Sequence, residues 1–86
     1  MSEIGQFRKK IDAVDEKILE ALCERVAVCR QIGEAKKKQG LPVRDTGREN
    51  QVYERIKQKS LQMGLDSTSV LVVYREIVNM CSCVQE

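Results

Sequence analysis

The sequence predicts an all-α fold of three helices, in which a very long first helix packs within a homodimeric helical bundle. Apolar residues recur in alternating steps of three and four, the spacing of one face of an α-helix, and no apolar–polar alternation of period two indicates a strand. Gly40, Pro42 and Gly64 divide the chain into three long segments. A chain of 86 residues is short enough to be one domain, residues 1–86.

The first helix is expected from about Gly5 to Gln39, because Gly40 favours a helix end and Pro42 breaks the pattern. Its apolar stripe consists of Ile4, Phe7, Ile11, Val14, Ile18, Ala21, Val28, Ile32 and Ala35. At roughly 1.5 Å per residue this helix spans about 50 Å, which exceeds the core of one small domain. Part of the stripe must therefore pack against something else. Oligomerisation is the obvious remedy, because a small monomer buries little of its surface.

The second helix is expected to begin near Asp45 or Thr46 and to end at Gly64. Thr46 and Glu49 have the spacing of a capping box, and Asp45 is the alternative N-cap. Asp66 or Ser67 is expected to cap the third helix. Its apolar face consists of Val70, Val73, Tyr74, Ile77, Cys81 and Val84.

The composition excludes several classes of function. The chain has no His, which excludes catalysis and metal binding by that residue. A net charge of +2 with 3% aromatic residues does not fit a nucleic-acid-binding domain. The four cysteines (Cys23, Cys29, Cys81 and Cys83) lack CxxC spacing, so we expect reduced packing residues and no metal site. Neither a signal peptide nor a membrane span is recognised, so we expect a cytoplasmic protein without a membrane partner.

Two basic residues stand out against the apolar stripe of the first helix. Arg25 occupies a stripe position where an aliphatic residue is expected, and Lys36 lies beside the stripe 11 residues later. The two share one helical face and are about 16 Å apart along its axis. Burying an unpaired guanidinium costs on the order of several kcal/mol, so Arg25 is expected to meet an anion. That anion is either a carboxylate of the protein itself or a small ligand held between the two cations.

A second polar cluster, Arg44-Asp45-Thr46-Gly47-Arg48-Glu49, lies at the predicted start of the second helix, where backbone N–H groups favour anions. Taken alone, Arg48 is typical of a solvated surface residue and Glu49 of a capping box. Their occurrence together with the two cations of the first helix favours one shared cavity. Arg44 is expected to remain at the surface, outside the site.

In order along the chain, these residues resemble the small all-helical chorismate mutases. The resemblance covers essentially the whole chain and rests on Phe7-Arg8-Lys9-Lys10-Ile11-Asp12, Asp15-Glu16-Lys17-Ile18-Leu19, Glu24-Arg25, Ile32-Gly33-Glu34-Ala35-Lys36, Pro42-Val43-Arg44-Asp45, Arg48-Glu49 and Gln85. No single tripeptide is specific, but the ordered set is. It implies an intertwined homodimer that rearranges chorismate to prephenate in phenylalanine and tyrosine biosynthesis. The reaction is intramolecular and is expected to use no cofactor.

The resemblance also implies which side chains contact the substrate: Arg8, Arg25, Lys36, Asp45, Arg48, Glu49, Cys81 and Gln85. The three arginines bind the two carboxylates, since arginine forks match carboxylate geometry. Lys36 and Gln85 donate hydrogen bonds to the breaking ether oxygen and, with Arg25, form the catalytic set. Glu49 holds the ring hydroxyl, helped by the backbone of Asp45. Cys81 is a departure, because many relatives carry Ser there and a thiol is a weaker donor.

Arg8 and Arg25 are 17 residues apart in the sequence, hence about 25 Å apart along one predicted helix. Two arginine side chains cannot close that gap onto one small dianion. If both bind the same substrate, Arg8 must come from the partner chain of a two-fold dimer.

Other functions remain open from the sequence alone. An isochorismate pyruvate lyase shares this fold and a similar cationic pocket, and a fold does not decide chemistry. A non-catalytic ligand-sensing module and a helical interaction module with structural ion pairs are further alternatives. An assay that follows chorismate and identifies the product distinguishes them, because the lyase releases pyruvate and the two modules turn nothing over.

Overall fold

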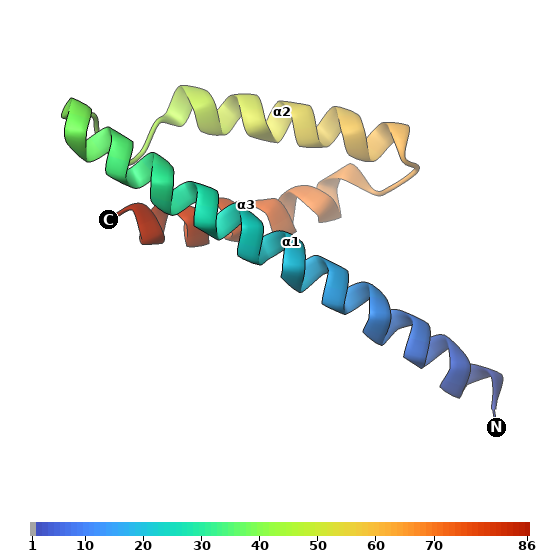
Figure 1. Ribbon diagram of the computed structural model, residues 1–86. Coiled ribbons are helices and arrows are strands. Elements are labelled where there is room, and N and C mark those ends of the chain that lie inside the picture. The colour runs from blue at the N-terminus through green and yellow to red at the C-terminus, as the bar shows by residue number, and fades with distance from the viewer. Residues whose placement is uncertain (1) are drawn as a thin grey trace.

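The computed structural model describes residues 2–86, which form three helices: α1 (Glu3–Gln39), α2 (Thr46–Gln62) and α3 (Ser67–Gln85) (Figure 1). The described residues contain no strand. The predicted all-α class, with three helices and a long first one, is therefore confirmed. Met1, the first residue of the predicted domain, lies outside the described residues.

α1 is one unbroken helix of 37 residues. It begins two residues before the predicted Gly5, because the Ser2 hydroxyl oxygen accepts a hydrogen bond from the Gly5 backbone N–H at 3.1 Å and so caps the helix. It ends at Gly40, whose φ of 68° lies in the left-handed region that glycine adopts without steric cost. No helix in residues 2–86 combines the length and the hydropathy needed to cross a membrane.

α2 begins after Asp45, whose carboxylate accepts a hydrogen bond from the Arg48 backbone N–H at 3.0 Å. Asp45 is therefore the N-cap. The capping box predicted for Thr46 and Glu49 is wrong, because the Glu49 side chain turns toward Arg44 and forms two hydrogen bonds with it.

α3 follows a short loop that contains Gly64, whose φ is 75°. The helix starts at Ser67, with Asp66 as its N-cap. The Ser69 hydroxyl donates a hydrogen bond to the Asp66 carboxylate at 2.6 Å, and this bond lowers the pKa of Asp66. The predicted start of the third helix is confirmed.

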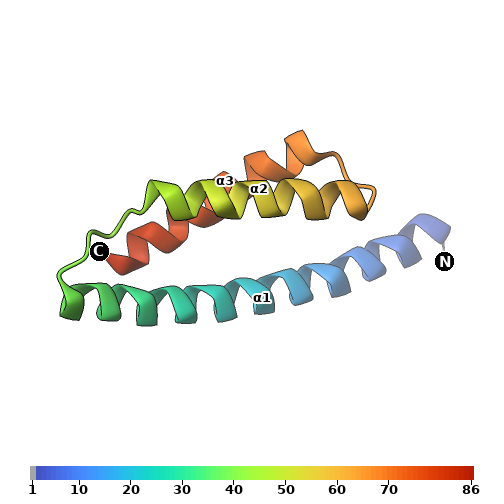
Figure 2. The same ribbon diagram turned by 90° about the horizontal axis from the view of Figure 1, so that it is seen from above.

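The three helices do not form a closed bundle within one chain. α3 packs against both α1 and α2, whereas α1 and α2 are not packed against each other. The N-terminal half of α1 projects beyond the other two helices (Figures 1 and 2). The chain is accordingly elongated, with principal extents of 58 × 24 × 15 Å.

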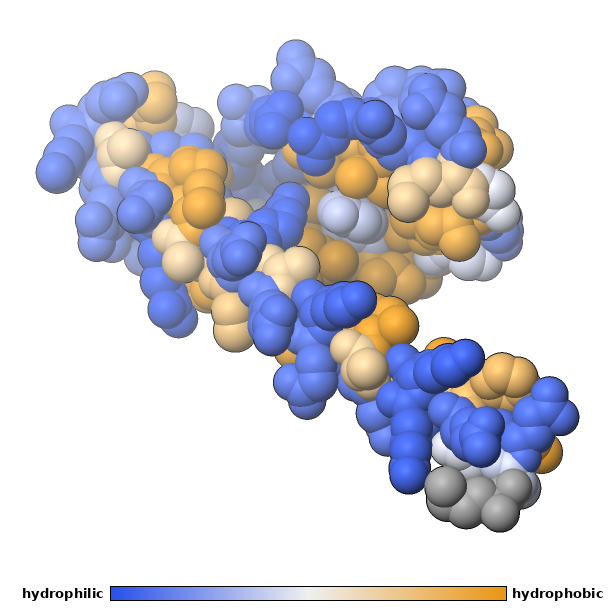
Figure 3. Space-filling model, turned by 45° about the vertical axis from the view of Figure 1, so that its right-hand side comes forward, coloured by the Kyte–Doolittle hydropathy of each residue, from blue (hydrophilic) through white to orange (hydrophobic). Residues whose placement is uncertain are grey.

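The face of α1 that is covered within the chain differs from the predicted stripe. Between residues 21 and 39 the buried or half-buried positions are Leu22, Arg25, Val26, Cys29, Gly33 and Lys36. The stripe residues Val28 and Ile32 are 51% and 42% exposed. In the projecting half, Ile4, Phe7, Ile11, Val14 and Ile18 are 49–61% exposed, and apolar surface remains visible along this arm (Figure 3). The helix thus has two neighbouring apolar faces, of which α3 covers only one.

Gly33 marks a very close approach of α1 to α3. A Cβ atom at this position would lie 2.8 Å from Cα of Gln85 and 3.1 Å from its Cβ and Cγ atoms. A backbone atom cannot rotate away, so the two helices would have to separate. We expect Gly33→Ala to lower the free energy of unfolding by about 1–3 kcal/mol, the usual cost of overpacking.

Urea unfolding of Gly33→Ala beside Gly47→Ala measures this effect. Gly47 is a suitable control, because a Cβ there would meet only Asp45 Oδ1 at 3.4 Å, an ordinary contact. The control should be as stable as the parent or more stable, since Ala favours helix over Gly. Parental stability of the Gly33 variant would show that the helices are not held at this distance.

Candidate functional site

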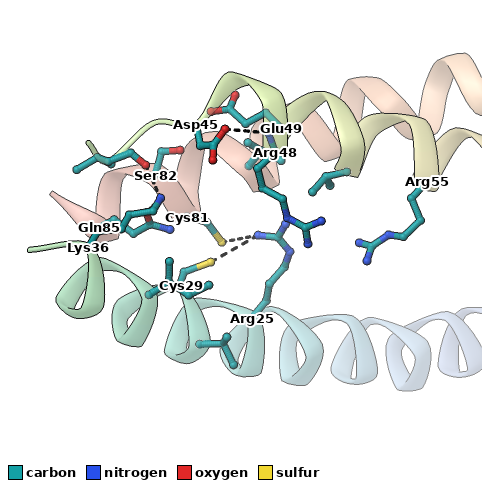
Figure 4. Close-up of a pocket in the computed structure, with 15 residues that line it drawn as sticks. Arg25, Cys29, Lys36, Asp45, Arg48, Glu49, Arg55, Cys81, Ser82 and Gln85 are labelled. Atoms are coloured by element: carbon teal, nitrogen blue, oxygen red, sulfur yellow. Dashed lines mark hydrogen bonds between the residues drawn. The ribbon is translucent and has the colours of Figure 1, made fainter. Parts of the chain in front are cut away.

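A cavity of about 470 Å³ lies between the C-terminal ends of α1 and α3 and the first turns of α2. Seven of the eight predicted site residues line it: Arg25, Lys36, Asp45, Arg48, Glu49, Cys81 and Gln85 (Figure 4). They come from all three helices and from the connector between α1 and α2. Arg8 is not among the lining residues and is exposed on the projecting half of α1.

Arg25 is half-buried at the floor of the cavity and contacts two sulfur atoms. Its Nη1 donates to Sγ of Cys81 at 2.7 Å and to Sγ of Cys29 at 3.7 Å (Figure 4). Burial raises the pKa of the Cys29 thiol, and the neighbouring Cys81 adds to this effect. Sulfur is a weak acceptor, so these contacts leave most of the guanidinium's hydrogen-bonding capacity unused. Among residues 2–86 no carboxylate forms an ion pair with Arg25.

Lys36 and Gln85 meet at the opposite end of the cavity. Lys36 Nζ donates to Oε1 of Gln85 at 2.8 Å and also to the backbone carbonyl of Val43. Gln85 is buried, with 9% of its surface exposed. Because Lys36 occupies the amide oxygen, the orientation of the Gln85 amide is fixed and its Nε2 remains available as a donor.

The two acidic residues of the site already have partners. The Asp45 carboxylate caps α2 through the Arg48 backbone. The Glu49 carboxylate pairs with Arg44, and this pairing lowers the pKa of Glu49. The charge of Lys36 lowers it further, by a smaller amount. Arg44 does not line the cavity, as expected, but its contact with a predicted site residue was not foreseen.

Several lining residues were not singled out from the sequence. Arg55 lies seven residues after Arg48, two turns along the same face of α2, and its side chain extends beside the cavity (Figure 4). This seven-residue spacing from Arg48 is the signal in the sequence that could have identified Arg55 as a lining residue. Cys29 is likewise one turn after Arg25. Ser82 lies three residues before Gln85, on the same face of α3, so its spacing is a signal as well. The apolar walls are formed by Val28, Ile32, Val43, Val52 and Val78.

The charges of the cavity favour a small anion with an apolar body. Four cationic side chains line it, whereas the only ion pair within residues 2–86 joins Arg44 to Glu49. A volume of about 470 Å³ is in the usual range for a small-molecule site. The described residues contain no cluster of three or more potential metal ligands.

Comparison with known proteins assigns the family. The profile described as chorismate mutase type II matches residues 7–86. The chain belongs to this family. Over 84 residues it is 39% identical to the bifunctional chorismate mutase/prephenate dehydratase of Aquifex aeolicus, a match that covers 94% of this chain and 23% of that protein. Over 86 residues it is 27% identical to the chorismate mutase of Methanocaldococcus jannaschii and covers 87% of it.

A third relative is the bifunctional chorismate mutase/prephenate dehydratase of Escherichia coli K12. It is 44% identical over 50 residues, which are 58% of this chain and 13% of that protein. The chain therefore spans most of the archaeal chorismate mutase but only about a quarter or less of the two bifunctional relatives. The predicted family and the predicted chorismate mutase activity of this domain, an isomerase, are confirmed.

Proposed function

We propose that the cavity between the three helices is the site at which this chain rearranges chorismate to prephenate, for phenylalanine and tyrosine biosynthesis. The observation that carries the proposal is that seven residues predicted from the sequence line one cavity, whose cations have no carboxylate of the described residues as partner. In this rearrangement one C–O bond breaks and one C–C bond forms within a single molecule. The protein must therefore fix a conformer and stabilise charge.

Binding would use the arginines that the free chain leaves unpaired. Arg25 would exchange two weak sulfur contacts for a substrate carboxylate, and Arg48 would bind from the first turn of α2. Holding both carboxylates keeps the enolpyruvyl group over the ring, which is the compact reactive conformer. The buried wall residues Val52 and Val78 lower the local dielectric and so strengthen these interactions.

Lys36 and Gln85 would act on the ether oxygen. Negative charge develops on this oxygen as the C–O bond breaks, so donors held in place before the reaction stabilise the transition state more than the substrate. The hydrogen bond from Lys36 to Gln85 supports this role, because it holds the amide by its oxygen and so fixes the direction of the Nε2 donor. Glu49 would accept the ring hydroxyl.

We further propose a two-fold dimer in which Arg8 of one chain completes the site of the other. The unbroken α1 keeps Arg8 far from Arg25 within one chain. The exposed apolar residues around Arg8 need a covering surface, and a second copy of α1 offers the same apolar residues in return. The proposed dimer would thus complete the site and, at the same time, cover the projecting half of α1.

Gln85→Glu is expected to change the pH dependence of the reaction. A carboxyl group donates only when protonated, and its charge would repel the developing oxyanion. Lys36 at 2.8 Å favours the charged form, so the variant should work best at acidic pH. Initial rates across the pH range measure this effect, with Gln85→Ala as the control, whose activity should be low at every pH. A flat profile of parental height would contradict contact between residue 85 and the ether oxygen.

The decisive experiment for the function itself follows the ultraviolet absorbance of chorismate and identifies the product. Prephenate is expected. Pyruvate released from isochorismate, supplied in a parallel assay, would instead indicate the lyase, and no turnover of either compound by the folded protein would indicate a binding module.

A further inference from the structure

Arg44 connects a cavity residue to the third helix. Its Nε donates to Glu49 Oε2 at 3.0 Å and its Nη2 to Glu49 Oε1 at 3.0 Å, so the guanidinium holds both carboxylate oxygens. The same Nη2 donates to Oδ1 of Asn79 on α3 at 3.1 Å. The side chain of Arg44 thus spans from the connector to two helices.

The two partners face different surroundings. The Arg44 side chain is 50% exposed and does not line the cavity, whereas the Glu49 side chain is 18% exposed and does. A carboxylate offers about four lone-pair positions, of which Arg44 occupies one on each oxygen. The remaining positions stay available to a hydroxyl group in the cavity. A side chain held in this way loses little further rotamer freedom when it binds a ligand.

We propose that Arg44, held by Asn79, is a positioning residue that keeps Glu49 as an oriented, charge-balanced acceptor for the ring hydroxyl of the substrate. This inference rests on the proposed function. It also accounts for the presence of a carboxylate in a cavity meant for a dianion. Without a cation directly behind it, Glu49 would repel the substrate carboxylates and the charge that develops on the ether oxygen.

Electrostatic surroundings agree with this role. The hydrogen bonds and the charge of Arg44 lower the pKa of Glu49, and Lys36 from α1 acts in the same direction. Burial and the nearby Asp45 carboxylate raise that pKa. If Arg44 were removed, burial and the Asp45 carboxylate would no longer be offset by its charge, and Glu49 would protonate at a higher pH.

The other groups near this pair have smaller roles. Arg48 lies beside Glu49 on α2 and lines the same cavity. Glu49 is the main cause of the raised pKa of the Arg44 guanidinium, Tyr53 on α2 and Cys83 on α3 add less to it, and Asn79 is uncharged. None of these groups replaces the two-pronged contact that Arg44 makes with Glu49.

The test begins with the kinetics of Arg44→Ala in the full chain. The hydroxyl contact is present in both the bound substrate and the transition state, so its loss should appear mainly as a higher KM, by about 10-fold, with a smaller fall in kcat. The acidic limb of kcat/KM should move to higher pH, since that profile reports the free protein. Arg44→Lys should restore only part of the effect, because an ammonium cannot form the fork. Arg30→Ala, an exposed arginine of α1 outside the cavity, serves as the matched control and should match the parent.

A double-mutant cycle and a titration separate positioning from a general effect of charge. In a Glu49→Gln background, Arg44→Ala should have little further effect on KM. Carboxyl NMR of Glu49 in the free protein should show a higher pKa in Arg44→Ala than in the parent, and circular dichroism should show an unchanged fold. Parental KM and pH profile in Arg44→Ala, or fully additive effects in the cycle, would overturn the proposal. If the parent itself turns over no chorismate, the proposed function fails, whereas an unchanged Glu49 titration would show that the anchoring by Arg44 fails.

Discussion

Lys36→Ala is expected to lower kcat by about 100- to 1,000-fold, the usual effect of losing one donor to a developing oxyanion. The structure adds a reason for the upper part of this range. Lys36 also holds the amide oxygen of Gln85, so the variant loses one donor and the alignment of another. The ammonium acts on charge that appears mainly in the transition state, so kcat should fall more than KM rises.

Steady-state kinetics and thermal unfolding of the same preparation measure the effect. Lys37→Ala is a matched control, because the neighbouring lysine is exposed and does not line the cavity. It should keep parental activity. Lys36→Ala should keep a helical spectrum, since only its contacts with Val43 and Gln85 are lost. Near-parental kcat in a folded Lys36 variant would rule out its role at the ether oxygen.

The sequence predicted the helices well, because their limits depend on local chemistry. Gly40 ends α1 and Asp45 starts α2 through contacts with residues only a few positions away. The covered face of α1 was harder to predict. Its two apolar faces both have helical spacing, and only the position of α3 decides that Cys29 and Gly33 are buried while Ile32 is exposed.

In the candidate site, too, features set by neighbouring residues could be predicted from the sequence, whereas contacts set by tertiary packing could not. The cluster from Asp45 to Glu49 was recognisable from spacing and resemblance. The pairing of Arg44 with Glu49 depends on how the connector turns, and its contact with Asn79 depends on the packing of α3. No pattern within one segment of the sequence contains that information. Arg55, by contrast, was accessible from its seven-residue spacing to Arg48.

The shared-site dimer makes the most stringent prediction. Arg8→Ala and Arg25→Ala homodimers should each be nearly inactive, because every site lacks one arginine that binds a carboxylate. Unfolding and refolding the two variants together in equal amounts should give about half heterodimers by random pairing. Each heterodimer would have one complete site and one doubly damaged site, so roughly a quarter of parental activity should return.

A second mixture distinguishes a shared site from a general effect of refolding. Arg25 and Arg48 line the same cavity of one chain, so Arg25→Ala and Arg48→Ala damage the same half of the site. Their heterodimers would have one lesion in each site, and no complete site could form. Activity should therefore return only when Arg8→Ala is one of the two variants. Confirmed heterodimers of Arg8→Ala and Arg25→Ala without recovered activity, or equal recovery in both mixtures, would show that Arg8 does not act across the interface.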